Sequence, residues 1–305
     1  MRGDASPKCF LASVRPPNPL QTTTITRINS AGRQICEDLV ATEEPLEIRV
    51  AGQALAVVMR TPGHDRELAT GFLLTEGVLQ RRDDLLDLVY CRPLDGTPRD
   101  NIIEAVLAPG LAVDLERLTR HVFSASSCGI CSKASIDAIR TRYAPLAASF
   151  APRAAVLARL PAALAEQQAG FSRTGGVQGA ALFTADGTLL VAREDVGRHN
   201  AVDKVLGHAF LAGSLSQREP GAPYPAAAGA SVGCILLVSG RVSFEIVQKA
   251  LAAGVPCLAA ISAPTSAAIA LAAEAGQTLV GFLRAETDGD PATRFNLYAG
   301  SVADR

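Results

Sequence analysis

Residues 234–282 decide the fold class of this chain, and they read CILLVSGRVSFEIVQKALAAGVPCLAAISAPTSAAIALAAEAGQTLVGF. Three apolar runs, at 234–239, 255–261 and 278–282, alternate with two segments of helical period, at 243–253 and 266–275. Strands that alternate with helices in this way form parallel pairs joined by right-handed crossovers. The stretch therefore predicts an α/β layer in the C-terminal part of the chain.

The composition of the whole chain limits what it can bind. Its 305 residues are 48% apolar, which is enough to bury a core at this length. The formal net charge is -1, so the protein has no global field to hold nucleic acid or an anionic membrane, and an anionic ligand needs a local site. The seven cysteines are odd in number and scattered, which favours a reducing compartment over a disulfide scaffold.

The sequence predicts no membrane segment at its N-terminus or in its longest uncharged stretch. Residues 1–21 are expected to be a disordered tail, since the apolar stretch at 9–14 is too short for the core of a signal peptide. Residues 250–273 have no charge, but Pro256 and Pro264 interrupt them and argue against a membrane span. We expect no membrane partner.

The order of the remaining elements predicts two domains. A smaller α+β subdomain is expected over residues 22–120 and an α/β domain over 121–305. In the first we expect a hairpin at 46–50 and 54–61, helices at 66–74 and 114–121, and a strand at 101–108. In the second we expect helices at 133–143, 161–169 and 200–210, a hairpin at 180–184 and 188–193, and a proline-rich loop at 214–231.

The most specific motif is Cys128-Gly129-Ile130-Cys131, in a loop rich in serine directly before a predicted helix. The positive end of a helix dipole lowers the pKa of a thiol and makes it a better nucleophile. Zinc ligation, disulfide exchange and sulfur transfer compete as uses of this pair. The other five cysteines form no second close pair for a zinc site, and a thioredoxin-like motif belongs after the first strand of a domain. A thiol that carries a group is favoured, and an incidental pair of loop cysteines is the alternative.

Residues 193–204 are rich in polar side chains where a predicted strand passes into a helix, a usual position for ligand contacts in α/β proteins. Four of them are expected to form a hydrogen-bonding network: Asp195, His199, Asn200 and Asp203. Arg198 and Lys204 are expected to meet phosphates at the helix N-terminus. The alternative is a solvated helix start with Asn200 as its cap.

Two glycine turns are candidate anion sites. Ser239-Gly240-Arg241 joins a strand to a helix, where backbone amides can approach an anion and Arg241 adds further donors. The turn lacks the Walker pattern, so a nucleotide hydrolase is not supported, and a plain connection is the alternative. The loop Thr174-Gly175-Gly176 is comparable.

Six segments of the chain, in order, resemble motifs of the FdhD/NarQ family of sulfur carrier proteins required for formate dehydrogenase activity. They are TGFLLTEG at 70–77, SCGIC at 127–131, TGG at 174–176, EDVGRHNAVDK at 194–204, SGR at 239–241 and GFLR at 281–284. The resemblance runs from about residue 22 to residue 300. It implies a cytidine-deaminase-like layered fold in the second domain and a cytoplasmic homodimer.

The resemblance also implies an activity and its partners. The protein would be a sulfurtransferase that takes sulfur from a cysteine desulfurase as a Cys128 persulfide. It would pass this sulfur to the molybdenum bis(molybdopterin guanine dinucleotide) cofactor, a substrate with guanine nucleotide ends, for use by formate dehydrogenase. Cys131 would be a second thiol that assists or resolves.

The cofactor-binding stretch of the family corresponds to Phe282, Leu283, Arg284, Ala285, Glu286 and Thr287. To these we add the candidates Gly175, Gly176, Arg198, His199, Ser239, Gly240 and Arg241. Two departures from the family stand out. Gln178 occupies a position that is often His, and an acidic run from Glu286 to Asp290 lies beside the expected phosphates.

Two rival functions remain open. A non-catalytic chaperone would bind and deliver the same cofactor, and a metal-binding hydrolase would use a deaminase-like fold. Against the second, no His-x-Glu or Cys-x-Glu precedes a Pro-Cys-x-x-Cys signature, and Ser127 stands where that proline would be. We therefore expect no zinc and no other metal site.

Overall fold

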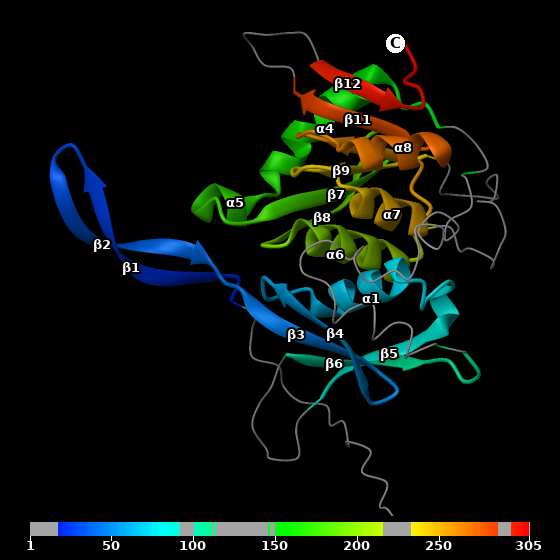
Figure 1. The fold of residues 1–305 in the computed structure, drawn as a ribbon, viewed down its shortest axis with the longest axis horizontal. Helices are drawn as coiled ribbons and strands as arrows, with labels where there is room; N and C mark the ends of the chain where they lie inside the picture. Colours follow the sequence, from blue (N-terminus) through cyan, green and yellow to red (C-terminus); the bar gives the residue numbers. More distant parts are fainter. Residues whose placement is uncertain are drawn as a thin grey trace, which may run out of the picture.

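The computed structural model describes residues 18–91, 101–111, 113, 146, 150–215, 233–285 and 294–304. These residues form a mixed α/β structure with a six-stranded sheet, a four-stranded sheet and a separate two-stranded hairpin. Figure 1 shows α1 and α6 lying between the two larger sheets. The helices that connect the strands therefore also join the two halves of the molecule.

The six-stranded sheet contains the predicted α/β layer, with strand order β12-β11-β10-β9-β7-β8. Its parallel centre consists of β9 (Cys234–Val238), β10 (Cys257–Ala260) and β11 (Thr278–Arg284). The crossovers are α7 (Phe244–Ala252) and α8 (Ser266–Glu274). Three antiparallel strands complete the sheet: β7 (Gln178–Thr184) and β8 (Leu189–Asp195), which form the predicted hairpin, and β12 (Arg294–Ala299). The α/β prediction is confirmed.

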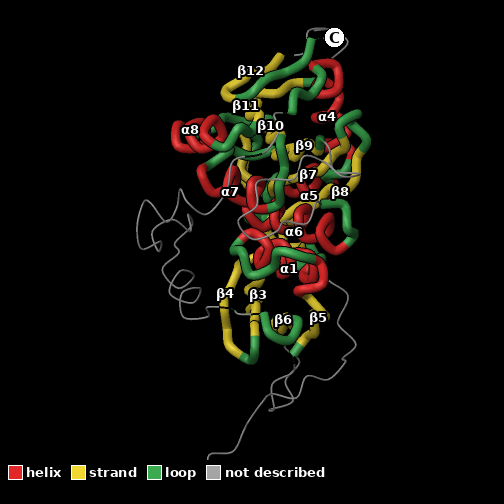
Figure 2. The backbone as a smooth tube through the Cα atoms, turned by 90° about the vertical axis from the view of Figure 1, so that its right-hand side faces the viewer, coloured by secondary structure: helices red, strands yellow, loops and turns green. Residues whose placement is uncertain are grey.

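Both faces of this sheet are covered, which explains the unbroken apolar run of β9. Leu236 and Val238 enter one core with α6 (Arg198–Leu211), α7 and α8. Ile235 and Leu237 enter the opposite core with α4 (Ala154–Glu166). Figure 2 shows α7 and α8 on one side of the strands and α4 on the other. Alternate residues of a strand point to opposite faces, so a strand covered on both faces must be apolar throughout.

The four-stranded sheet has the order β4-β3-β6-β5. Its strands are β3 (Glu44–Val50), β4 (Gln53–Arg60), β5 (Leu85–Tyr90) and β6 (Ile102–Leu107), with the short helix η1 (Arg82–Asp84) before β5. Helix α1 (Asp65–Thr75) covers its inner face, where Ile48, Leu68 and Ile103 are fully buried. The predicted β3–β4 hairpin, the helix after it and the strand at 101–108 are confirmed.

Helices α1 and α6 touch through their backbones. A Cβ on Gly71 would lie 1.9 Å from the carbonyl oxygen of Asp203, and a Cβ on Gly207 would lie 1.9 Å from that of Glu67. Real Cβ atoms do not approach so closely, so only glycine fits at either crossing point. The contact between the two halves therefore depends on these two residues.

Several boundaries differ from the prediction. Strand β1 (Leu20–Asn29) begins inside the expected tail and pairs with β2 (Gly32–Ala41), a hairpin that the sequence analysis missed. Its threonines, arginines and acids give no clear apolar alternation, because most of its side chains are exposed. Helix α4 begins seven residues before the predicted 161 and contains Pro161 within it. Helix α6 begins at Arg198, with Gly197 as its cap and no side-chain cap.

Other predictions fall outside the described residues. They are the tail over residues 1–17, the helices at 114–121 and 133–143, the loop from residue 216, and the domain boundary at 120. Of the helices that the structure describes, none combines the length and the apolarity needed to cross a membrane.

Candidate functional site

The described candidate binding residues meet at one edge of the six-stranded sheet. This edge is formed by the carboxyl ends of β8, β9, β10 and β11. Strand β7 runs antiparallel to β9, with Ala180 opposite Val238, so β7 starts at the same edge. The candidate binding segments all adjoin these strand ends, at residues 175–176, 198–199, 239–241 and 282–285.

The turn after β9 is bound to the start of β7. The Ser239 amide donates to the Gly179 carbonyl, and the Gly179 amide donates to Ser239 Oγ, both at 2.9 Å. A Cβ on Gly240 would lie 2.7 Å from Gln178 Oε1 and 3.7 Å from Arg198 Cβ. Gln178, Arg198 and Gly240 are therefore immediate neighbours, and Gly240 leaves room for the other two.

Three arginines at this edge differ in how far their donors are occupied. Arg241 is exposed. Arg198 is partly buried, and its Nε is a buried donor without a hydrogen-bond partner among the described residues. Arg284 donates through Nη1 to the carbonyls of Ile261 and Leu283. Arg198 and Arg241 thus offer the donors for an anion, whereas Arg284 is partly committed to the backbone.

His199 is held as a neutral group. Its Nε2 lies 3.3 Å from Ser243 Oγ and 3.4 Å from Glu245 Oε2. Burial, followed by the positive charges of Lys249 and Arg198, lowers the His199 pKa to about 3 in spite of the nearby carboxylate. The imidazole is therefore uncharged at neutral pH and can orient a ligand or a neighbour by hydrogen bonding.

Ser243 and Glu245 belong to the site but were not singled out from the sequence. Ser243 is the N-cap residue of α7, and Glu245 lies in its first turn. A serine followed by an acid at the start of a helix is the usual capping pattern, so the sequence signal for these two residues is purely structural. Only the fold brings them to His199.

Three helices begin at this edge. Their N-cap residues are Gly197 for α6, Ser243 for α7 and Thr265 for α8. Helix N-termini carry partial positive charge and unpaired amides, which favour anions. Together with Arg198 and Arg241 they make the edge suitable for phosphate groups.

The stretch at the end of β11 divides into exposed and buried residues. Phe282 is 41% exposed and has a φ of 54°, in the left-handed region that bulky side chains rarely adopt. Its amide donates to the Ser262 carbonyl at 3.1 Å. The side chain of Leu283, one of the predicted cofactor-binding residues, is fully buried in the core facing α4. Only its backbone remains accessible to such a role.

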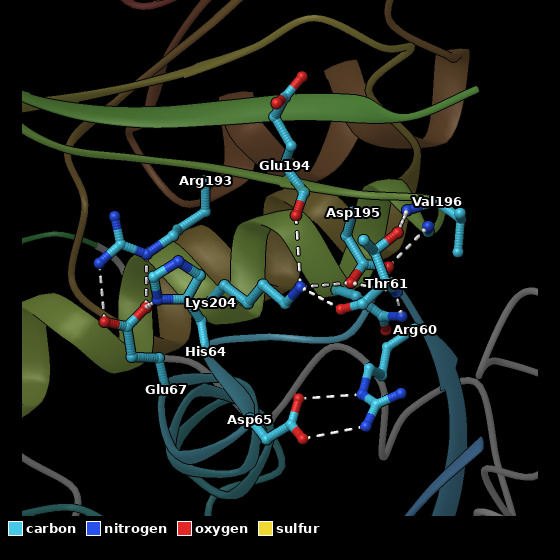
Figure 3. A network of polar contacts seen from close by, with 12 residues as sticks. Arg60, Thr61, His64, Asp65, Glu67, Arg193, Glu194, Asp195, Val196 and Lys204 are labelled. Carbon is cyan, nitrogen blue, oxygen red and sulfur yellow. Dashed lines mark hydrogen bonds and ion pairs between the residues drawn. The ribbon is translucent and has the colours of Figure 1, made fainter. Parts of the chain in front are cut away.

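Lys204 does not meet phosphates, which corrects the prediction made for it in the segment 193–204. Its ammonium is 1% exposed and lies 2.7 Å from Asp195 Oδ2 and 2.8 Å from the Thr61 carbonyl (Figure 3). Asp195 also accepts hydrogen bonds from the Gly197 amide at 2.8 Å and from Asn200 Nδ2 at 3.0 Å. The expected link between Asp195 and Asn200 is confirmed, and it holds the start of α6 against the β4–α1 connection.

Asp203 is likewise structural. Its carboxylate lies 2.8 Å from Lys249 Nζ and accepts a hydrogen bond from Thr75 Oγ1 at 3.0 Å. All three side chains are buried between α1, α6 and α7. Asp203 therefore does not join the network of Asp195 and Asn200 that the sequence suggested.

A second polar cluster holds α1 to β8. Glu67 receives two hydrogen bonds from Arg193, at 2.6 and 2.7 Å, and lies 2.9 Å from His208 Nδ1. Hydrogen bonds from Arg193, His64 and His208 outweigh burial and lower the Glu67 pKa far below its usual range. Figure 3 shows Glu67, His64 and Arg193 of this cluster beside the Lys204 ion pair.

The remaining site candidates lie outside the described residues. They are Cys128, Cys131, Glu286 and Thr287. The described cysteines are all free, and burial raises the Cys234 pKa to about 12, which leaves that thiol protonated. Within the described ranges, His, Cys, Asp and Glu side chains form no group of three or more that could hold a metal ion.

The fold and this edge define a class: an α/β protein with a candidate ligand site at the carboxyl ends of its parallel strands. The chain belongs to the FdhD/NarQ family, whose model matches residues 41–303.

Curated relatives support this assignment over nearly the whole chain. A protein of Streptomyces coelicolor named "Sulfur carrier protein FdhD" is 47% identical over 286 residues, which cover 92% of this chain and 93% of that protein. A protein of the same name from Mycobacterium tuberculosis is 47% identical over 257 residues, 82% of this chain and 88% of that protein. One from Anaeromyxobacter dehalogenans is 43% identical, with 93% of each chain covered.

A solved structure shares the fold. A crystal structure from Desulfotalea psychrophila, described as a candidate formate dehydrogenase accessory protein, superposes with a TM-score of 0.66. The two sequences are 23% identical, and the match covers 92% of this chain and 97% of the other.

Proposed function

We propose that this protein is a sulfur carrier that acts as a sulfurtransferase in the maturation of formate dehydrogenase. Membership of the FdhD/NarQ family and relatives of up to 47% identity named as sulfur carrier proteins support the proposal. The Cys128-Gly129-Ile130-Cys131 motif supplies the thiols that such a carrier needs. The proposal includes a cysteine desulfurase as sulfur donor and formate dehydrogenase as the final recipient.

The transfer begins with a thiolate at Cys128. It attacks the outer sulfur of the donor's persulfide, the sulfur–sulfur bond of the donor breaks, and the donor keeps its own thiolate. Cys128 then holds the outer sulfur as a persulfide, which is more acidic than a thiol. Attack by Cys131 on Cys128 Sγ would release this sulfur as hydrosulfide and leave a disulfide, so that the two thiols supply the electrons.

The receiving substrate is the molybdenum bis(molybdopterin guanine dinucleotide) cofactor, and we propose that the carboxyl edge of the six-stranded sheet binds it. The observation that carries this step is Arg198 Nε, which lies beside Gly240 and has no hydrogen-bond partner in the described part of the chain, at an edge where three helices begin. A polyanion with guanine nucleotide ends needs such donors. Phe282, exposed at the end of β11, lies in the stretch that corresponds to the cofactor-binding segment of the family.

The proposal extends to the setting of the reaction. We place it in the cytoplasm, because a carrier that works through free thiols needs a reducing compartment. We further propose a homodimer, and a cytidine-deaminase-like arrangement of the layers around the six-stranded sheet.

A mass measurement tests the transfer. After incubation with a cysteine desulfurase and free cysteine, the protein should gain one sulfur, and Cys128→Ala should abolish the gain. Cys36→Ala, at a partly exposed cysteine of β2, is the matched control and should leave the gain intact. Absence of the added sulfur, or its persistence in Cys128→Ala, contradicts a carrier role for this thiol.

Complementation separates transfer from chaperoning. In a cell that lacks its own family member, the unchanged protein should restore formate dehydrogenase activity and Cys128→Ala should not. Restoration by Cys128→Ala would instead support a protein that binds and delivers the cofactor without carrying sulfur. Cys131→Ala, measured beside it, shows whether the second thiol is required.

A further inference from the structure

The β1–β2 hairpin extends from the rest of the molecule as an arm, defined here as residues 20–41 (Figure 1). The pairing is continuous, from Leu20 opposite Ala41 to Asn29 opposite Gly32. Ten residues per strand give the arm a length of about 33 Å. It is a two-stranded sheet of its own, and no third strand joins it among the described residues.

An arm of this kind is poorly stabilised by itself. Two-stranded hairpins are marginal in water, and unpaired strand edges tend to recruit another strand. Ile35 on β2 is 75% exposed and Ile28 on β1 is 66% exposed, the two most exposed large apolar side chains described. Pairing of the free edge of β2 would give Ile35 a cross-strand neighbour and stabilise the arm.

The sequence of β2 is complementary to itself. Its outer half reads Arg33-Gln34-Ile35-Cys36-Glu37, and residues 33, 35 and 37 share one face of the strand. In an antiparallel pair centred on Ile35, this residue faces the partner subunit's Ile35. Arg33 then faces the partner subunit's Glu37, and by symmetry the same pair forms twice.

The other edge of the arm does not offer such a match. Strand β1 reads Thr22 to Ile28 without any acidic residue, so its one cation, Arg27, would have no opposite charge across a two-fold axis. Charge complementarity therefore favours β2 as the pairing edge and a second copy of this chain as its partner.

We propose that the free edge of β2 pairs with the same edge of a second copy to form a four-stranded antiparallel sheet, in the order β1-β2-β2-β1. Such an interface is isologous, as expected for a two-fold dimer. It gives a location to the homodimer proposed above. The base of the arm also lies beside the candidate site, since a Cβ on Gly176 would be 3.2 Å from Ala41 Cβ.

The test uses charge exchange in the full-length protein. We expect sedimentation velocity to show a dimer, and both Arg33→Glu and Glu37→Arg to weaken it by about tenfold, since each places like charges opposite one another twice. The double variant R33E/E37R restores opposite charges and should recover the dimer. Arg27→Glu makes the same charge change on β1, where Arg27 forms only a solvent-exposed ion pair with Asp38 at 3.9 Å, and should leave the dimer unchanged.

The outcomes separate this inference from the proposed function. Pairing through β2 is overturned if Arg33→Glu leaves the dimer affinity unchanged. It is also overturned if the double variant does not recover the dimer although its circular dichroism spectrum is unchanged. A protein that is monomeric at all concentrations overturns the homodimer as well. Sulfur loading of Cys128, measured on the same variants by mass, tests the carrier function independently of either result.

Discussion

The ammonium of Lys204 lies 2.7 Å from the carboxylate of Asp195 in a site where the two side chains are 1% and 0% exposed. The pair connects the first turns of α6 to the end of β8, and Lys204 also donates to the Thr61 carbonyl of the β4–α1 connection. Three segments that are far apart in the sequence thus meet at one ion pair. Its role is to hold the candidate edge in place.

Removing one member of this pair should destabilise the protein strongly. Lys204→Met leaves a buried carboxylate without its cation, which costs about 3–5 kcal/mol of unfolding free energy. The double variant K204M/D195N should lose less than Lys204→Met alone, because it leaves no buried charge and its amide oxygen can still accept from the Gly197 amide. The exposed pair of Arg66 and Asp87, at 2.7 Å, is the control, and Asp87→Ala should cost less than about 1 kcal/mol. Urea denaturation measures all four proteins, and equal losses at both sites would refute the assignment.

A methyl group at the crossing of α1 and α6 should also be costly. In an isolated helix Gly→Ala stabilises by about 1 kcal/mol, so propensity alone predicts a gain at Gly71 or Gly207. The 1.9 Å approach of a Cβ to Asp203 or Glu67 carbonyl oxygens instead predicts a loss of at least about 2 kcal/mol. Thermal unfolding of Gly71→Ala and Gly207→Ala decides the sign. Glu166→Ala, at an exposed position on α4, should leave the melting temperature nearly unchanged.

The stability of the protein should depend on His199 as the pH falls. The His199 pKa is about 3 in the folded state, below its ordinary 6.5, because burial and nearby cations oppose protonation. Between these values the unfolded chain binds a proton that the folded protein does not, so acidification favours unfolding. His199→Gln removes this contribution. As the pH is lowered from about 7.5 to about 4, the unfolding free energy of His199→Gln should therefore fall less than that of the unchanged protein.

Proton NMR gives an independent readout of the same group. The His199 ring signals should show no titration above pH about 4. A His199 midpoint near 6.5 would show that the imidazole is not held neutral.

Nucleotide affinity should distinguish the arginines of the candidate edge from others. Arg198→Gln and Arg241→Gln each remove charge-assisted donors and should weaken binding of guanosine diphosphate by about tenfold or more in titration calorimetry. Arg159→Gln is the matched control, since Arg159 donates to the Asp186 carbonyl in the β7–β8 turn, at the opposite edge of the sheet. Equal effects at all three positions would indicate that the nucleotide binds elsewhere or only through general charge.

Much of the fold could be predicted because periodicity reports burial directly. The apolar run of β9 and the alternation of strand and helix after it required a sheet covered on both faces. The arm could not be found in this way, since most of its side chains are exposed and carry no apolar period. Propensity for β structure is weak without a buried face to specify the register.

The candidate site was predictable in its residue types but not in its roles. Polar residues and glycines at strand ends pointed to Arg198, Gly240 and Arg241, and the strand order brings them together. Lys204 has the same composition signal as Arg198, yet it turns inward to Asp195. The different roles of Lys204 and Arg198 depend on which side of α6 faces the β4–α1 connection, and the local sequence pattern does not predict this.

The sequence by itself determined the α/β class, the alternation of strands and helices in the parallel part of the sheet, and the membership in a family. These depend on periodicity and on motifs along the chain. Only the tertiary structure decided which charged groups are available to a ligand. Burial between α1, α6 and the two sheets neutralises Lys204, Lys249 and Glu67 in ion pairs, whereas Arg198 keeps a donor without a partner among the described residues. The physical reason is that the cost of an unpaired charge depends on its distance from water, which is a property of the packed molecule rather than of the chain.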